Sequence, residues 1–296
     1  MAFAGSNAGQ YPNLQNATVD IGGATESLMP NGQRVYLNDG TFPNSVFTWP
    51  ALSDPGARAC ISIRPPLFEL NNPDMFPDLA AELDSFLQAA PQTGPPSLVG
   101  LWHEASTTGP GGSYDKCSAP PGYFTSLNTQ FCGQGGAAAL LRKAQQNVQS
   151  RAQDLKVNVL VGAIEVVNTP YSGTLAGNLN DWMAPGLDFY ACDVYDNKAG
   201  DAVAGDLLDA FQTVVQNLNP GVVPAIGITE TNSRFPGRRP RWFTDAWSWL
   251  QNNGQTSDRV CFLTFWDPTG LESGAWIPDD WATIDALHGI LARSSA

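Results

Sequence analysis

Two glutamates in this chain lie where the chemistry of a parallel-sheet protein is expected. Glu104 closes the segment Ser-Leu-Val-Gly-Leu-Trp-His-Glu, and Glu230 closes the segment Pro-Ala-Ile-Gly-Ile-Thr-Glu. A short, nearly continuous apolar run is typical of a parallel strand that is buried on both faces. In barrels of such strands, catalytic side chains gather at the carboxyl ends. Two carboxyl groups in these positions predict cleavage of a glycosidic bond.

Cleavage of a glycoside with retention requires a carboxylic acid and a carboxylate about 5 to 5.5 Å apart. The acid protonates the leaving oxygen, and the carboxylate attacks the anomeric carbon. The fourth and seventh strands of an eight-stranded barrel lie across its mouth from each other, so their terminal side chains can meet at that separation. We predict Glu104 as the acid/base and Glu230 as the nucleophile. Apolar neighbours such as Trp102 would keep Glu104 protonated, because burial disfavours the charged form.

Apolar runs alternate with helical stretches along the chain, which is the pattern of βα units in a parallel sheet. The eight apolar runs cover residues 2–6, 34–37, 59–63, 98–102, 157–164, 187–192, 223–228 and 260–265. Helical spacing of apolar residues covers 76–89, 137–155, 202–218, 241–252 and 281–292. This order predicts the α/β class and a single (β/α)8 TIM barrel, with one catalytic domain over residues 1–296.

A doubly wound sheet is the main alternative, and it requires a phosphate-binding glycine loop after an early strand. The glycine-rich stretches 109–112 and 133–136 both follow the fourth apolar run, which favours the barrel. Two connections are long, namely residues 105–136 after the fourth strand and residues 165–186 after the fifth. Loops of this length are generally functional, and in a barrel these two face the active side.

The composition excludes several classes of partner. The 28 acidic and 15 basic side chains give a net charge of −13, which repels nucleic acid at long range. No run approaches the roughly 20 apolar residues of a membrane span. Two His and one pair of loop cysteines offer no zinc-binding spacing, and the predicted chemistry needs no metal or cofactor. We expect a monomer whose partner is a polysaccharide or oligosaccharide.

Five cysteines bear on the compartment. Cys60, Cys192 and Cys261 lie inside predicted strands, whereas Cys117 and Cys132 lie in a Gly/Pro/Ser-rich segment. A disulfide between the last two fits an oxidising compartment, and five reduced thiols in a cytosolic protein are the alternative. The first residues lack the basic start and apolar stretch of a signal peptide. The expectation of a secreted, extracellular protein therefore depends on the cysteines.

Four short motifs resemble the family 26 glycoside hydrolases, the retaining β-mannanase group of a large barrel clan. They are Trp-His-Glu at the fourth strand, Asp-Val-Tyr after the sixth, Ile-Thr-Glu at the seventh and Phe-Trp at the eighth. The resemblance implies Glu104 as acid/base, Glu230 as nucleophile and His103 as a substrate contact. It also implies that Tyr195 hydrogen-bonds the nucleophile and that Trp266 forms a platform under the sugar.

The chain departs from that family directly after the acid/base. The aromatic residue expected there is replaced by Ala-Ser-Thr-Thr-Gly over residues 105–109, which puts the identity of the sugar in doubt more than the fold or mechanism. Neighbouring residues on a strand point to opposite faces, so His103 and Glu104 can share one pocket only if a bulge or the end of the strand re-aims one of them.

Several candidates also have a purely structural interpretation. His103 fits a packed core residue, and Tyr195 and Trp266 fit core aromatics. We include Asp193, Arg64 and Trp102 among the substrate-binding residues, with Asp193 as the first substitute if one glutamate is misassigned. Further acidic residues near strand ends and aromatic residues in loops are Glu165, Asp196, Asp267, Trp49, Tyr123, Tyr171, Trp182 and Trp276.

Four arginines crowd the connection after the seventh strand, at positions 234, 238, 239 and 241. A guanidinium group binds carboxylate in a bidentate fork, so Arg234, Arg238, Arg239 and Arg241 suggest recognition of a uronic acid, and ion pairs with nearby Asp are the alternative. The leading hypothesis is an endo-acting hydrolase of a mannan-like or related β-glycan. A catalytically silent carbohydrate-binding barrel is the rival from another class.

Overall fold

The computed structural model describes residues 2–6, 18–21, 24–27, 32–37, 40–48, 58–94, 96–105, 136–168, 175–196, 203–253, 261–265 and 281–294. The elements are β1 (Ala2–Ser6), β2 (Thr18–Ile21), β3 (Ala24–Ser27), β4 (Gly32–Leu37), η3 (Asn44–Thr48), β5 (Arg58–Ile63), α1 (Leu67–Leu70), α2 (Pro77–Ala89), β6 (Ser97–Leu101), α4 (Gly136–Leu155), β7 (Val159–Asn168), α5 (Leu175–Trp182), β8 (Phe189–Asp196), α6 (Ala204–Leu218), β9 (Ala225–Ser233), η6 (Pro236–Arg238), α7 (Arg239–Asn253), β10 (Cys261–Phe265) and α8 (Trp281–Ser294).

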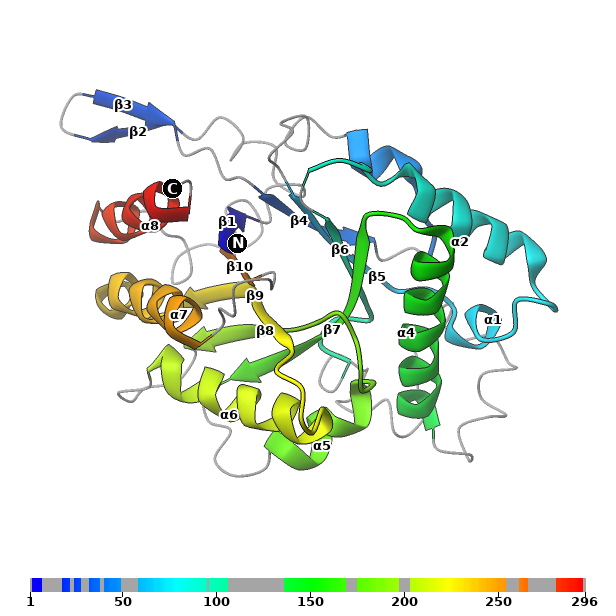
Figure 1. Cartoon of the computed structure of the whole chain (residues 1–296). Helices are drawn as coiled ribbons and strands as arrows, with labels where there is room; N and C mark the ends of the chain where they lie inside the picture. The colour runs from blue at the N-terminus through cyan, green and yellow to red at the C-terminus, as the bar shows by residue number, and fades with distance from the viewer. Residues whose placement is uncertain are drawn as a thin grey trace.

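Six parallel strands, β4 to β9, form a curled half-barrel in which each strand pairs with the next along the chain (Figure 1). β10 pairs with β9 and, on its other side, with β1 from Ala2 to Ser6. Ser6 also pairs with Gln33 of β4. The pairing order is thus β1-β10-β9-β8-β7-β6-β5-β4, and all of these pairs are parallel.

Side chains alternate between the two faces of the curled sheet. Leu98, Ile164 and Phe189 belong to a core cluster on the concave face, whereas the residues beside them pack toward the helices. Gly162 makes room on the concave face, since a Cβ there would lie 2.4 Å from the Phe189 carbonyl oxygen. Small residues opposite large ones let side chains fill the interior of a barrel.

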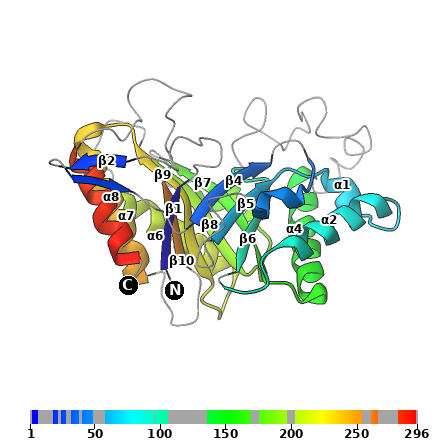
Figure 2. The same cartoon turned by 90° about the horizontal axis from the view of Figure 1, so that it is seen from above.

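The helices cover the convex face of the sheet. α1, α2 and α4 lie on one side of the strands and α6, α7 and α8 on the other (Figure 1 and Figure 2). In α6 the buried residues Leu208, Phe211 and Val215 recur at three- and four-residue spacing, which makes one apolar stripe. α7 buries Trp242, Phe243, Ala246, Trp247 and Leu250 in the same way. Amphipathic periodicity therefore decides how these helices dock.

All eight predicted strands and all five predicted helices occur among the described elements, with boundaries that differ by a few residues. The short strands β2 and β3, which pair antiparallel, and the helix α5 were not predicted. The predicted long loop over residues 165–186 is wrong, because β7 continues to Asn168 and α5 occupies Leu175–Trp182. Glu165 interrupts the apolar run, so the run alone did not reveal that β7 continues beyond it to Asn168. The long connection predicted after the fourth strand lies mostly outside the described residues.

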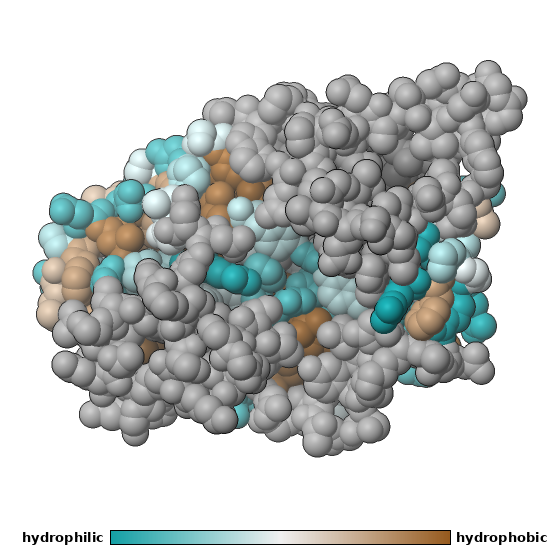
Figure 3. Space-filling view, turned by 180° about the vertical axis from the view of Figure 1, so that it is seen from behind, coloured by the Kyte–Doolittle hydropathy of each residue, from teal (hydrophilic) through white to brown (hydrophobic). Residues whose placement is uncertain are grey.

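Exposed apolar side chains are scattered over the described surface. The large ones with high exposure are Met75, Val222 and Val223. On the face seen from behind, hydrophilic and hydrophobic described residues are interspersed (Figure 3). Among the described helices, none combines the length and apolar character that crossing a bilayer requires.

Candidate active site

β9 carries a β-bulge immediately before Glu230. Cys192 of β8 pairs with Ile228, and the next residue of β8, Asp193, pairs with Glu230, so Thr229 has no opposite residue. One extra residue on one strand reverses the face to which the following side chains point. In a regular strand Glu230 would share the helix-facing side with Ile228. The bulge turns Glu230 to the concave side of the sheet.

The neighbours of Glu230 on β9 support this orientation. Ile228 packs in the helix-facing core, and Thr231 Oγ1 accepts a hydrogen bond from Trp242 Nε1 of α7 at 2.9 Å. Both residues therefore point toward the helices, although they are three positions apart in the sequence. An odd spacing is incompatible with strict alternation, so the strand must be irregular between them. Glu230 and Asn232 take the opposite, concave side.

Two hydrogen bonds join β8 and β9 beside the bulge. Tyr195 donates its hydroxyl hydrogen to Glu230 Oε2, and Thr229 Oγ1 donates to Asp193 Oδ1 at 2.5 Å. Asp193 and Tyr195 alternate with Cys192 and Val194, which pack against the helices, so both point to the concave side with Glu230. Asp193 is fully buried and Glu230 is 7% exposed. The structure thus brings Asp193, Tyr195 and Glu230 together within two neighbouring strands.

Glu104 lies in a turn beyond the end of β6. The strand ends at Leu101, and both Trp102 and Glu104 adopt positive φ, at 51° and 55°. The left-handed region costs a non-glycine residue about 1–3 kcal/mol and is often found at functional sites. The backbone N–H groups of Trp102 and Glu104 donate to the carbonyls of Ile63 and Ile164, at 2.8 and 2.9 Å. The turn is therefore held between β5 and β7, and the strand end supplies the irregularity that the sequence required.

His103 packs against an aromatic residue that the sequence interpretation missed. Its ring centroid lies 4.9 Å from that of Tyr36, and the two rings are tilted by 57°. Tyr36 comes from β4, and its position near the end of an apolar run was the available signal. His103 is 9% exposed, so both a packed and a substrate-contacting role stay compatible with its position.

Trp102 lies in the hydrophobic core rather than on an open surface. Its side chain is 2% exposed, and its Nε1 donates a hydrogen bond to the Pro65 carbonyl at 2.8 Å. The guanidinium carbon of Arg64 lies 5.9 Å from the Trp102 ring centroid. Trp102 therefore fixes the turn that carries Glu104 and contacts Arg64.

Three of the four arginines after the seventh strand have a partner within the chain, which favours local pairing over binding of an anionic substrate. Arg238 pairs with the buried Asp196 at 3.2 Å, and Arg241 pairs with Asp245 at 3.4 Å. Arg239 is fully buried and donates from Nε to the Ser233 carbonyl at 3.1 Å. Local pairing, the alternative interpretation, explains Arg238 and Arg241.

Asp196 points toward these arginines instead of toward Glu230. Its carboxylate accepts a hydrogen bond from Ser233 Oγ at 2.9 Å. Burial raises the pKa of Asp196 above its ordinary value of 3.8, while the bond from Ser233 and the charge of Arg238 oppose the shift. Arg238 also lies over the Phe235 ring, with Cζ 3.9 Å from the centroid. This cluster therefore anchors the start of α7 to the ends of β8 and β9.

Two further candidates lie away from the concave side. Glu165 is 1% exposed and pairs with Cys192 in the register of β7 and β8, at a position facing the helices. Trp182, which was predicted in a loop, ends α5 and packs in the core. Neither is therefore placed to receive a sugar beside Glu230.

Other predictions fall outside the described residues. These are the platform Trp266, the proposed Cys117–Cys132 disulfide, Asp267, Trp49, Tyr123, Tyr171 and Trp276. Cys60 and Cys192 are buried and form no disulfide, and burial raises the pKa of Cys192 well above its ordinary value. In the described part of the chain, no group of three or more His, Cys, Asp or Glu side chains is arranged to hold a metal ion.

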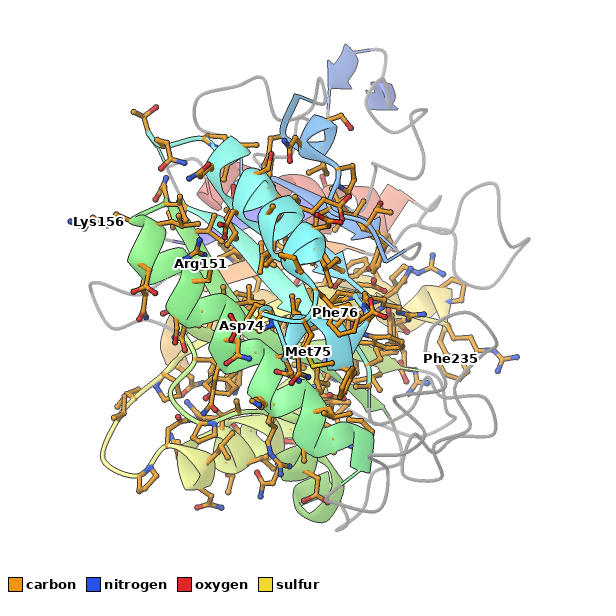
Figure 4. The ribbon with its side chains drawn as sticks, turned by 90° about the vertical axis from the view of Figure 1, so that its right-hand side faces the viewer. Asp74, Met75, Phe76, Arg151, Lys156 and Phe235 are labelled. Carbon is orange, nitrogen blue, oxygen red and sulfur yellow. The ribbon has the colours of Figure 1, made fainter. Side chains whose placement is uncertain are left out.

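A groove of about 810 Å³ lies on the helical layer, away from the strand ends. It is formed by α1, α2 and α4, and its lining includes Asp74, Asp84 and Arg151. Arg151 of α4 makes a bidentate ion pair with Asp84 of α2. In Figure 4 Asp74 and Arg151 lie on this helical layer, and Phe235, which follows β9, lies apart from them. None of the predicted site residues lines this groove.

No protein-family model and no curated protein sequence matches this chain. Solved structures resemble it at the level of the fold. A GH26 β-mannanase from Bacteroides ovatus has a TM-score of 0.52 at 13% identity, over 90% of this chain and 79% of that chain. A β-mannanase from a symbiotic protist of the termite Reticulitermes speratus has a TM-score of 0.51 at 12% identity, over 100% and 87%.

A GH5-4 broad specificity endoglucanase from an uncultured bacterium gives a TM-score of 0.53 at 12% identity, over 87% of this chain and 81% of that chain. Two families of glycoside hydrolase thus resemble the chain equally well. At these identities the likeness shows the fold, which the chain shares with barrel-type glycoside hydrolases, and it does not select family 26.

Proposed function

We propose that this chain is a retaining glycoside hydrolase that cleaves a β-linked polysaccharide internally, with Glu230 as the nucleophile and Glu104 as the acid/base. The bulge at Thr229 carries this proposal, because it directs Glu230 to the concave side, where Tyr195 donates a hydrogen bond to it. The strained turn at Glu104 adds support, since backbone strain is often retained where chemistry needs it.

In this mechanism Glu104 protonates the leaving oxygen while Glu230 attacks the anomeric carbon to form a covalent glycosyl-enzyme. Glu104 then removes a proton from water, which displaces the sugar from Glu230 and retains the configuration. Tyr195 donates a hydrogen bond to Oε2 of Glu230 and so orients the carboxylate for the attack. His103 and Asp193 would contact the substrate, and Trp266 would form the platform beneath the sugar.

The proposal includes a complete (β/α)8 barrel. The pairs between β1 and β10 and between Ser6 and Gln33 support closure of the half-barrel. We also propose a monomeric, secreted protein with a Cys117–Cys132 disulfide. Size-exclusion chromatography tests the monomer, and thiol alkylation followed by mass spectrometry tests the disulfide. A dimer, or alkylation of both cysteines without a reductant, would contradict them.

The fold shared with β-mannanases and an endoglucanase makes β-mannan and β-glucan the first substrates to test. We expect the wild-type protein to release oligosaccharides from at least one member of a panel that also contains xylan and a uronic-acid polymer. The Glu230→Ala variant should release none. Turnover at the wild-type rate in that variant would exclude Glu230 as the nucleophile.

Two further measurements separate the roles of the two glutamates. A 2-deoxy-2-fluoro glycoside of the preferred sugar should add one glycosyl mass to the wild-type protein and to the Glu104→Gln variant, but not to the Glu230→Ala variant. Azide should restore turnover of an activated aryl glycoside by a Glu104→Ala variant, because azide replaces the water that Glu104 activates. Binding of glycans without turnover by any form of the protein would favour a silent carbohydrate-binding barrel.

A further inference from the structure

Arg64 is a partly buried cation without an anionic partner in the described structure. Its Nε atom is buried and has no hydrogen-bond acceptor among the described residues. The ion pairs found there join Arg151, Arg238 and Arg241 to aspartates and do not include Arg64. A chain with a net charge of −13 has many carboxylates available, yet none of those in the described residues forms an ion pair with this guanidinium.

Arg64 lies at the edge of the sheet that carries the proposed acid/base. It directly follows β5, and its backbone N–H donates to the Leu37 carbonyl at the end of β4 at 3.1 Å. Its guanidinium lies over the ring of Trp102, the residue that starts the turn leading to Glu104. Trp102 in turn donates its backbone N–H to Ile63, the residue before Arg64. The cation and Glu104 therefore belong to two adjacent, hydrogen-bonded segments.

The chemistry of this arrangement favours an anionic ligand. Removing a cation from water is costly when no anion or acceptor replaces the lost hydration. A guanidinium stacked on an aromatic ring keeps its N–H edge available, and that edge matches the two oxygens of a carboxylate. A neutral sugar offers only uncharged hydroxyl acceptors to the same fork, and hydrogen bonds to these are weaker than those to a carboxylate.

We infer that Arg64 binds an anionic substituent of the glycan, in the first place the carboxylate of a hexuronic acid. This inference rests on the proposed function, and it names the class of substrate as an acidic β-glycan. The residue assigned to bind the acidic sugar is then Arg64 at the end of β5. The arginines after β9 are mostly paired within the chain.

The test is calorimetric binding to the Glu230→Ala protein, which holds the substrate uncleaved. An acidic oligosaccharide is compared with its carboxyl-reduced counterpart and with a sulfated neutral one. Arg64→Gln in this background should weaken binding of the acidic oligosaccharide by about tenfold to a hundredfold, as expected for the loss of hydrogen bonds to a charged group. It should leave the carboxyl-reduced sugar unchanged. Arg64→Lys, which keeps the charge without the fork, should give an intermediate loss.

Arg241→Gln is the matched control, because it removes the same charge from an exposed residue that already pairs with Asp245. It should leave all affinities unchanged. The thermal midpoint of Arg64→Gln should not fall below that of the parent, since no ion pair is lost. If Arg64→Gln has a lower thermal midpoint than the parent and loses affinity equally for acidic and carboxyl-reduced sugars, Arg64 has a structural role and the inference is overturned. If the sulfated oligosaccharide binds more strongly than the carboxylated one, Arg64 still binds an anion, but the preferred group is a sulfate and the assignment to a hexuronic acid is overturned.

Failure of this inference and failure of the proposed function give different results. If the protein turns over a neutral glycan normally but does not prefer acidic over carboxyl-reduced oligosaccharides, only the proposed role of Arg64 is overturned. Arg64-dependent binding of acidic sugars by a protein that cleaves nothing overturns the hydrolase and leaves the anion site. No binding of any acidic sugar overturns the inference outright.

Discussion

Tyr195 donates its hydrogen bond to Glu230 across two strands whose register places these residues two positions apart. Tyr195 pairs with Asn232, and Glu230 pairs with Asp193, so the tyrosine side chain reaches back along the concave face to the carboxylate. Residues two apart on a strand share a face, which makes this contact possible. One oxygen of Glu230 is thereby fixed before any substrate binds.

Removing the Tyr195 hydroxyl should slow catalysis. In a Tyr195→Phe variant we expect kcat to fall by about tenfold to a hundredfold with little change in KM, because the variant loses a hydrogen bond to a charged group that orients the nucleophile. Steady-state kinetics on the preferred glycan measures this. Tyr190→Phe is the matched control, since Tyr190 Oη donates to the Ala184 carbonyl in the helix-facing core. That variant should lose stability and keep its kcat. Equal kcat values for Tyr195→Phe and the wild type would contradict the positioning role.

The bond from Thr229 to Asp193 predicts an effect on stability. Thr229→Val keeps the side-chain shape but removes the donor to a fully buried carboxyl group. We expect the free energy of unfolding to fall by about 1–3 kcal/mol, because a buried polar group loses its partner. Urea unfolding monitored by Trp fluorescence measures the change. Thr229→Ser, which keeps the hydroxyl, should lose less, and equal losses in the two variants would show that the hydrogen bond contributes nothing.

Asp196 should give the folding stability a characteristic pH dependence. Because its pKa is raised in the folded state, the folded protein keeps the proton to a higher pH than the unfolded chain does. The contribution of Asp196 to stability is therefore present below its ordinary pKa of 3.8 and is lost as the pH rises from there through the raised folded value. In Asp196→Asn this loss is absent.

The measurement is the free energy of unfolding of the wild type minus that of Asp196→Asn, taken at a series of pH values. We expect this difference to decrease with pH across that window and then to level off. Arg238→Gln should steepen the decrease, since it removes the cation that favours ionised Asp196. A difference that grows with pH would mean that pairing with Arg238 outweighs burial.

The C-terminus of α4 offers a stabilising substitution. Lys156 adopts a φ of 53° directly after the helix, and Val157 N–H donates to the Ala152 carbonyl in the pattern of a Schellman cap. Glycine occupies this conformation without the steric cost of a Cβ. We expect Lys156→Gly to raise the free energy of unfolding by about 1 kcal/mol. Lys156→Ala, which removes the charge but keeps the Cβ, should give no gain, and a similar gain in both variants would attribute the effect to charge.

Local patterns predicted the parallel strands and most of the long helices, but not β2, β3 or α5. The runs at 98–102 and 223–228 predicted β6 and β9 because burial on both faces leaves a nearly continuous apolar stretch that is visible in a few residues. Helical periodicity predicted α4 and α6 for the same reason. The polar continuation of β9 was missed, since polar residues in a strand have no comparable local signature, and the continuation of β7 was missed beyond Glu165, which interrupts its apolar run.

The amino-acid sequence by itself determined that Glu104 and Glu230 come shortly after apolar runs that form strands, because strand formation depends on short-range alternation and burial. Only the tertiary structure decided that Glu230 points to the concave side, since a single unpaired residue, Thr229, reverses the alternation without changing composition. It likewise decided that Arg238 pairs with Asp196, whereas Arg64 has no ion pair among the described residues. Ion pairs depend on which strand ends meet in space, and that is a property of the sheet as a whole.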